Sequence, residues 1–131
     1  MVIVDTSVWI DALRGNVNPQ SLWLRGAIAS RDIGLTSLVL CEVLQGVSLI
    51  SQFRGFREDL LQFPVFETGS TKLAFASAQN YRILRQKGFT VRRTIDCILA
   101  TFCIEHGHQL LHNDRDFDVF EAHLDLRVVH P

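Results

Sequence analysis

The chain has 131 residues, which is the size of one domain and is long enough to bury a core of its own. With 47% hydrophobic and 21% charged residues, its composition is that of a soluble globular protein, and no apolar run approaches the roughly 20 residues that cross a bilayer. The net charge of −1 gives no hint of a nucleic-acid partner. We therefore expect a single domain, residues 1–131, without a membrane segment.

The opening run, residues 1–5, has no basic stretch before its apolar residues, so we expect no signal peptide. The three cysteines form no CxxC pair and lie in apolar stretches, which predicts buried free thiols at Cys41, Cys97 and Cys103. The lack of an export signal and of a disulfide framework both indicate a cytoplasmic location.

In the first half of the chain, the apolar run Val2–Val4 predicts a buried strand. Thr6 or Ser7 can cap a helix over about residues 8–13, which ends at Gly15. The pattern then predicts a helix over 19–29, a strand at 33–35, a helix capped by Thr36 or Ser37 that carries Leu38, Cys41, Glu42 and Gln45, a helix over 51–61 and a short strand at 65–66.

In the second half, an amphipathic helix is expected over residues 70–87, stopped by Gly88. Thr94 can cap a helix over 95–105 that is apolar nearly all round, which predicts a central, buried helix. Strands follow at 109–112 and 126–129. Strands that alternate with helices predict an α/β fold, with a central, mostly parallel sheet of four or five short strands covered by helices on both faces.

Four acidic residues fall where such a fold places its chemistry, beyond the carboxyl ends of the strands. Asp5 and Asp114 follow predicted strands, Glu42 lies in the helix after the second strand, and Asp96 lies in the first turn of the apolar helix. A carboxylate at the edge of the core costs several kcal/mol unless it is paired or metal-bound. Taken singly, Asp96 could be an ordinary first-turn acid and Asp5 a turn residue, but four such coincidences point to one site.

Clustered carboxylates repel one another and need a cation to stay ionised. Oxygen-only ligands favour a hard ion, Mg²⁺ or Mn²⁺. Zinc is the weaker alternative, because no HExxH or paired-cysteine spacing accompanies His106, His108 and His112. The motifs of serine hydrolases, P-loop proteins and dinucleotide-binding proteins are absent, as is the DxD motif of haloacid-dehalogenase-type phosphatases.

Four segments together resemble the PIN-domain family, and within it the VapC-type toxins of toxin–antitoxin pairs. They are Asp5-Thr6-Ser7-Val8-Trp9-Ile10, Ser37-Leu38-Val39-Leu40-Cys41-Glu42-Val43, Thr94-Ile95-Asp96-Cys97-Ile98-Leu99-Ala100 and His112-Asn113-Asp114-Arg115-Asp116-Phe117. The resemblance spans nearly the whole chain, and it implies a PIN-like three-layer fold.

The resemblance also implies a function and a set of site residues. Asp5, Asp96 and Asp114 match the family's metal-binding acids, together with Glu42 as a fourth catalytic acid, and Ser7 and Asp116 match supporting polar positions. The implied activity is a metal-dependent endoribonuclease, blocked by a VapB-like antitoxin and usually dimeric. The alternatives are a PIN-like binding module without catalysis, and a nuclease or phosphohydrolase that acts on DNA or small phosphates.

Two further sets of residues are candidates for binding. The interval between Glu67 and Asp96 contains basic residues and no acid, so Arg85, Arg92 and Arg93 are candidates for RNA phosphate contacts; a solvated helix face is the alternative interpretation. An antitoxin could insert an Arg or Lys among the acids and anchor in an apolar groove. Candidates for that groove, which could equally be core residues, are Trp9, Ile10, Trp23 and Leu49.

Overall fold

The computed structural model describes all residues, 1–131, and contains one five-stranded parallel sheet with the strand order β3-β2-β1-β4-β5. The strands are β1 (Val2–Val4), β2 (Ile33–Thr36), β3 (Val65–Phe66), β4 (Gln109–Leu111) and β5 (Arg127–Val128). The predicted α/β class with a parallel sheet of four or five short strands is confirmed.

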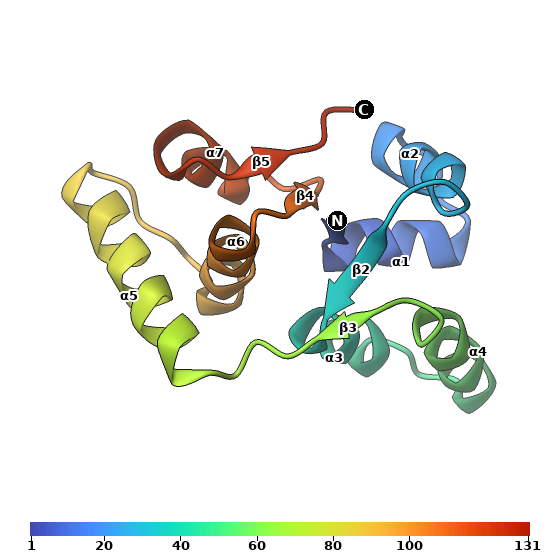
Figure 1. Ribbon diagram of the computed structural model, residues 1–131. Coiled ribbons are helices and arrows are strands. Elements are labelled where there is room, and N and C mark those ends of the chain that lie inside the picture. The colour runs from blue at the N-terminus through green and yellow to red at the C-terminus, as the bar shows by residue number, and fades with distance from the viewer.

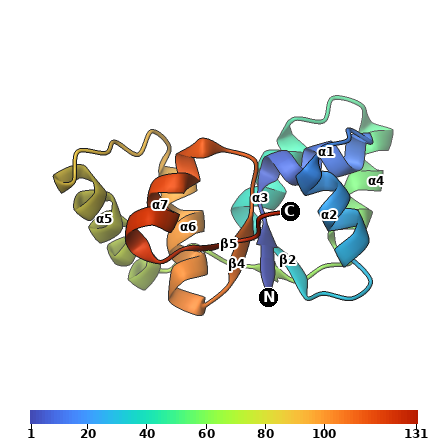
Figure 2. The ribbon, with the colours of Figure 1, turned by 90° about the horizontal axis from the view of Figure 1, so that it is seen from above.

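Seven α-helices and one short 3₁₀-helix cover the sheet. They are α1 (Thr6–Arg14), α2 (Pro19–Ala27), α3 (Ser37–Gln45), α4 (Ile50–Leu60), α5 (Thr71–Gln86), α6 (Thr94–His106), η1 (Arg115–Phe117) and α7 (Asp118–Leu124). Figures 1 and 2 show three layers, with α1 to α4 on one face of the sheet and α5 to α7 on the other. None of the helices combines the length and the hydrophobicity that a membrane-spanning helix needs.

The central strand β1 is buried along its whole length, with Ile3 and Val4 at 0% exposure. A parallel strand whose two faces are both covered reads as a continuous apolar run, as this one does. The helix α6 is also central, because seven of its residues are buried, including Leu99, Phe102 and Cys103. The helix is apolar nearly all round because it lies between the sheet and α5. The prediction of a central, buried helix is confirmed.

The order of the strands creates a switch point beside β1. The chain runs outward from β1 through β2 to β3, then crosses back to β4 on the other side of β1. The backbone N–H of Asp5 donates to the carbonyl of Leu111 at 2.9 Å, which extends the β1–β4 pairing to the carboxyl edge of the sheet. Ligands of open α/β sheets bind at such a switch point.

Two expectations about local structure are wrong. Cys41 is exposed, because it lies on the outward face of α3, whereas Cys97 and Cys103 are buried free thiols as expected. Neither Thr6 nor Ser7 caps α1, since the cap position is Asp5 and makes no side-chain cap bond. Their hydroxyls donate instead to acidic side chains, so the structure uses these residues in the site described below.

Two more boundaries differ for identifiable reasons. Thr94 is the first residue of α6 and Arg93 occupies its cap position, again without a side-chain cap bond. The strand β4 ends at Leu111 rather than at His112, because the chain turns there and the His112 ring accepts the backbone N–H of Asp114 at 3.1 Å. The other predicted helices and strands agree with the structure to within two residues at each end.

Candidate active site

Asp5 is placed at the carboxyl edge of the sheet by the central strand. It is 7% exposed, and Ser7 Oγ donates to its Oδ2 at 3.3 Å. The pKa of Asp5 is raised to about 6, chiefly by burial; the Thr6 backbone N–H and the Ser7 hydroxyl lower it, and the nearby Asp96 and Glu42 charges contribute to the rise. The carboxyl group therefore keeps its proton to a higher pH than an ordinary aspartate does, unless a cation binds beside it.

Asp96 occupies the first turn of α6 and faces the same edge of the sheet. It is 5% exposed, and its buried Oδ2 has no hydrogen-bond partner. Its pKa is raised to about 6, chiefly by burial; the Arg93 guanidinium opposes the rise, and the charge of Asp114 contributes to it. Among the buried side-chain polar atoms that lack a partner, Asp96 Oδ2 is the only carboxylate oxygen, so it is available to ligate a cation.

Glu42 reaches the site from α3 and is held from two sides. Thr6 Oγ1 donates to its Oε1 at 2.8 Å, and Arg93 donates to its Oε2 at 2.7 Å. The Thr6 contact was missed by the sequence analysis, which considered this residue as a cap. No local pattern signals this contact, because Thr6 and Glu42 are 36 positions apart in the sequence.

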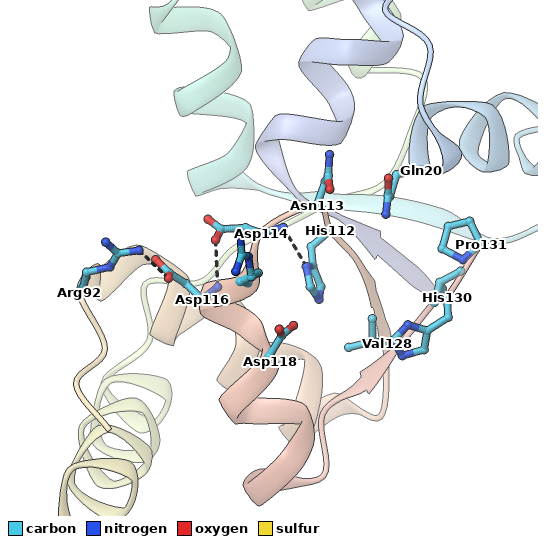
Figure 3. A pocket seen from close by; sticks show the side chains of 12 residues that line it. Gln20, Arg92, His112, Asn113, Asp114, Asp116, Asp118, Val128, His130 and Pro131 are labelled. Carbon is cyan, nitrogen blue, oxygen red and sulfur yellow. Dashed lines mark hydrogen bonds and ion pairs between the residues drawn. The ribbon is translucent and has the colours of Figure 1, made fainter. Parts of the chain in front are cut away.

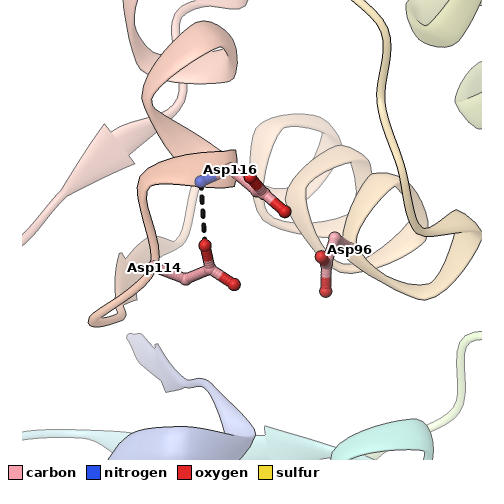
Figure 4. A group of neighbouring side chains, drawn as sticks. All are labelled: Asp96, Asp114 and Asp116. Atoms are coloured by element: carbon pink, nitrogen blue, oxygen red, sulfur yellow. Dashed lines mark hydrogen bonds between the residues drawn. The ribbon is translucent and has the colours of Figure 1, made fainter.

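Asp114 and Asp116 come from the turn after β4. The turn is fixed by the bond from the Asp114 N–H to His112 Nδ1 and by a bond from the Asp116 N–H to Asp114 Oδ1 at 2.9 Å (Figure 3). Oxygens of Asp96, Asp114 and Asp116 lie within 4.8 Å of one another (Figure 4). Asp116, which the sequence analysis gave a supporting role, thus lies with two of the three proposed metal ligands.

The four predicted acids line one pocket of about 250 Å³. Ser7 lines it as well, and so does Asn113, which the sequence analysis did not single out. The full lining is Asp5, Thr6, Ser7, Ile10, Glu42, Gln45, Arg93, Asp96, Asn113 and Asp114. We call this the acid pocket. Asp5 and Glu42 belong to it, although they lie outside the tight group of Asp96, Asp114 and Asp116.

A larger open cavity of about 700 Å³ adjoins the acid pocket and shares Asp114 and Asn113 with it (Figure 3). Its other polar lining includes Gln20, Arg92 and His130. The cavity is therefore wide, polar and continuous with the acids.

The three predicted RNA-binding arginines differ in their surroundings. Arg85 is exposed and donates to Thr90 at 2.7 Å, on the far end of α5. Arg92 is also exposed and pairs with Asp116 at 2.7 Å, whereas Arg93 points into the acid pocket. The structure thus brings Arg92 and Arg93, but not Arg85, to the acidic residues.

The two tryptophans lie on the opposite side of the sheet from α6. Trp9 is only 2% exposed and packs against Phe63 with ring centroids 5.0 Å apart, so its surface is limited to one wall of a shallow apolar pocket. Trp23 is partly buried against the core. Of the other groove candidates, Ile10 lines the acid pocket and Leu49 is 58% exposed.

The histidines do not complete a metal site. His106 and His108 stack with ring centroids 6.1 Å apart near the opposite edge of the sheet. His112 accepts a hydrogen bond from the backbone N–H of Asp114. The group of side chains close enough to share an ion consists of aspartates alone. An all-oxygen donor set with an unpartnered buried carboxylate fits a hard divalent cation.

Comparison with known proteins identifies the family. The PIN domain model matches residues 2–122. The chain belongs to the PIN-domain family. Among PIN-domain relatives, Ribonuclease VapC11 of Mycobacterium tuberculosis is 27% identical over 130 residues, which cover 98% of this chain and 97% of the relative, and VapC ribonuclease Mb1587 of Mycobacterium bovis matches equally well. The chain is thus a distant homologue of the VapC toxin nucleases.

Solved structures of PIN-domain complexes share the fold. The toxin–antitoxin complex VapBC2 of Rickettsia felis, bound to promoter DNA, contains a chain with a TM-score of 0.78 and 19% identity, and the match covers 98% of each chain. FitAcB of Neisseria gonorrhoeae contains a chain with a TM-score of 0.75 and 22% identity, covering 100% of this chain and 98% of that chain.

Proposed function

We propose that this PIN-domain protein is a Mg²⁺- or Mn²⁺-dependent endoribonuclease and the toxin of a VapBC-type toxin–antitoxin pair. The observation that carries the proposal is the burial of Asp5 and Asp96 in one pocket, where Asp96 Oδ2 has no partner. Two buried carboxylates beside two further acids are costly without a cation. The relationship to ribonucleases over nearly the whole chain supports RNA as the substrate.

Asp5, Asp96 and Asp114 are the proposed metal ligands, and the position of Asp116 makes it a fourth candidate. When bound, a divalent ion would polarise a phosphodiester oxygen and lower the pKa of a bound water. Glu42 is oriented by the Thr6 hydroxyl, so one carboxylate oxygen is fixed and the other faces Arg93. This arrangement suits a residue that accepts a proton from, or orients, the attacking water.

The substrate would enter through the larger cavity. Its width and polar lining suit a nucleic-acid backbone, and Arg92 supplies a positive charge at its rim. Arg85 would contact phosphates only if the RNA extended along α5. Since RNA is recognised chiefly through shape and unstacked bases, these residues do not specify a sequence.

A VapB-like antitoxin is the proposed protein partner. Large apolar side chains are exposed on α2, α4 and the adjoining loops, namely Val17, Leu22, Ile28, Leu49, Ile50 and Leu61. One of them, Ile28, lines a mostly apolar pocket of about 260 Å³ that also includes Trp9 and Phe63. An apolar antitoxin segment would pack here, and Trp23 rather than the buried Trp9 would supply most of the aromatic contact.

A basic antitoxin side chain would then block the acid pocket, since guanidinium–carboxylate bonds are among the strong charge-assisted pairs. The test is to titrate the purified complex with Mn²⁺ while RNA cleavage is followed, using antitoxins in which the basic tail residues are replaced. Inhibition should weaken as these residues are removed. Inhibition that survives replacement of every basic tail residue would show that the acid pocket is not the blocked site.

The experiment that tests the proposed activity is a substrate panel. Purified protein is incubated with structured RNA, single-stranded DNA, duplex DNA and a small phosphodiester, each with Mg²⁺, Mn²⁺ or EDTA, and Asp5→Asn serves as the inactive control. We expect cleavage of RNA only, with metal only, and only by the wild type. Preferential cleavage of DNA or of the small ester would identify the runner-up enzyme, and no cleavage by any combination would favour a binding module.

A further inference from the structure

Arg93 places its own guanidinium inside the acid pocket. It donates to Glu42 Oε2 at 2.7 Å, and its Nε lies 4.0 Å from Asp96 Oδ2. That Asp96 oxygen is the buried one that has no hydrogen-bond partner. A single side chain therefore faces two of the four acids and is the one cationic group in the pocket lining.

The backbone and the side chain of Arg93 are held differently. The backbone occupies the cap position of α6, where its carbonyl accepts the N–H of Cys97 at 3.3 Å. The side chain is 54% exposed, whereas its partners Glu42 and Asp96 are 13% and 7% exposed. The guanidinium can thus leave toward solvent without disturbing the helix, while the carboxylates stay in place.

Competition follows from charge. A guanidinium within reach of Glu42 and Asp96 neutralises part of the repulsion among the acids, which is also what a divalent cation would do. Two cations in one pocket repel each other, so each lowers the affinity of the other, and the coupling is reciprocal. The 4.0 Å separation from Asp96 is too long for a hydrogen bond, which leaves this oxygen available to another ligand.

We infer that Arg93 is an intramolecular counter-cation of the acid pocket, which stabilises the metal-free protein and is displaced from Glu42 and Asp96 when a divalent metal binds. The inference rests on the proposed metal site and adds its regulation. Its consequence is that the metal affinity is set partly by this arginine. A ligand that attracts the guanidinium, such as an RNA phosphate, would then strengthen metal binding.

The test measures metal binding, not activity. Metal-free wild type, Arg93→Gln, Arg93→Lys and Asp96→Asn are titrated with Mn²⁺, and free Mn²⁺ is followed by electron paramagnetic resonance. The matched control is Arg85→Gln, because Arg85 is an exposed arginine whose partner is Thr90. Arg93→Gln should bind Mn²⁺ about threefold to tenfold more tightly than the wild type, which is the range for a partly exposed, charge-assisted pair. Arg93→Lys and Arg85→Gln should stay near the wild-type affinity.

The outcomes separate this inference from the proposed function. Mn²⁺ binding that Asp96→Asn abolishes, but that Arg93→Gln leaves unchanged or weakens, would overturn the role of Arg93 alone. Mn²⁺ binding that Asp96→Asn leaves intact would overturn the metal site and this inference together. Nuclear magnetic resonance of the wild type gives a second readout that needs no variant to fold: the Arg93 Nε–Hε signal should move during a Mg²⁺ titration, and a signal that stays in place contradicts displacement.

Discussion

At the scale of single residues, the site is defined by carboxylates that the fold removes from water. Asp5 and Asp96 are both less than a tenth exposed, and their pKa values are raised to about 6 chiefly by burial. Ordinary surface acids are ionised throughout the physiological range and cost nothing to keep. Ionising Asp5 and Asp96 at neutral pH lowers the stability of the folded protein, and a bound cation would offset this loss.

The variant Asp96→Asn should therefore stabilise the metal-free protein and abolish RNA cleavage. The amide keeps the shape of the side chain, removes a repelling charge and loses a proposed metal ligand. We expect the free energy of unfolding at pH 7 to rise by about 1 kcal/mol, measured by urea denaturation in EDTA. Cleavage at the wild-type rate in Mg²⁺ would contradict the metal-ligand role of Asp96.

The pH dependence of stability follows from the same two groups. Their native pKa of about 6 lies above the usual value of 3.8, so between about pH 4 and 6 the native state binds more protons than the unfolded state. The stability of the metal-free protein should thus be greatest below pH 4 with respect to these groups. It should fall by about 1 to 3 kcal/mol per group as the pH rises through 6.

Thermal melts in EDTA between pH 4.5 and 7.5 measure this effect. Asp5→Asn and Asp96→Asn serve as matched variants, and each should flatten the decline of melting temperature. In calorimetry near pH 6, Mg²⁺ binding to the wild type should release protons, because bound carboxylates must be ionised. Equal melting profiles for the wild type and both variants would contradict the raised pKa values.

At the scale of secondary-structure elements, the sheet depends on a close approach at Gly34. A Cβ there would lie 2.8 Å from Met1 Sδ, 3.1 Å from Phe66 Cε2 and 3.2 Å from the Pro64 carbonyl oxygen. The Pro64 contact is to backbone, so β2 and the chain leading into β3 would have to separate. A larger residue would require these neighbours to move by a few tenths of an ångström.

Gly34→Ala should therefore lower the free energy of unfolding by about 1 to 3 kcal/mol, the usual cost of overpacking a core. The control is Gly26→Ala, which lies in α2 with nothing within 4 Å of its added Cβ. This control should stabilise the protein by up to about 1 kcal/mol, because alanine is the better helix residue. Equal effects of the two variants in denaturant titrations would refute the packing argument.

Much of this organisation is predictable from the sequence because it depends on local patterns. The apolar circumference of residues 95–105 indicates a buried helix, and α6 has seven buried residues. The strand-end positions of Asp5 and Asp114 indicate the edge of the sheet at which they lie. Both signals are contained in a few neighbouring residues and do not require knowledge of the packing.

The remaining features depend on contacts between distant parts of the chain. Threonine is a common helix-capping residue, but in the structure the Thr6 hydroxyl donates to the carboxylate of Glu42, 36 positions away. Arg93 belongs to a basic segment that suggests RNA contact, yet in the structure it pairs with Glu42, 51 positions away. Competition between a local and a distant partner is decided by tertiary structure, so no local pattern could reveal it.

At the scale of the whole molecule, an apolar surface on α5 and α6 remains uncovered. Phe75 is 73% exposed, and a mostly apolar pocket of about 410 Å³ lies between the two helices and includes Tyr81 and Ile98. Large exposed aromatic side chains beside an apolar pocket are typical of protein interfaces. This face is our candidate surface for the expected homodimer.

If copies of the chain pair through α5 and α6, Phe75→Glu should convert a dimer into a monomer. The matched control is Ile50→Glu, since Ile50 is 67% exposed on α4, on the other face of the sheet. Light scattering coupled to gel filtration should give the monomer mass for Phe75→Glu and the dimer mass for the control. A monomeric wild type at tens of micromolar, or a dimeric Phe75→Glu, would rule out this interface.

The central claim, that the acid pocket cleaves RNA with the aid of a metal ion, is tested most directly by sequencing RNA ends. Total RNA is incubated with wild type or Asp5→Asn, in Mg²⁺ or in EDTA, and new ends are mapped. We expect discrete new ends at a limited set of sites with wild type in Mg²⁺, and none in the other three samples. The same ends in the Asp5→Asn sample, or ends that persist in EDTA, would contradict it.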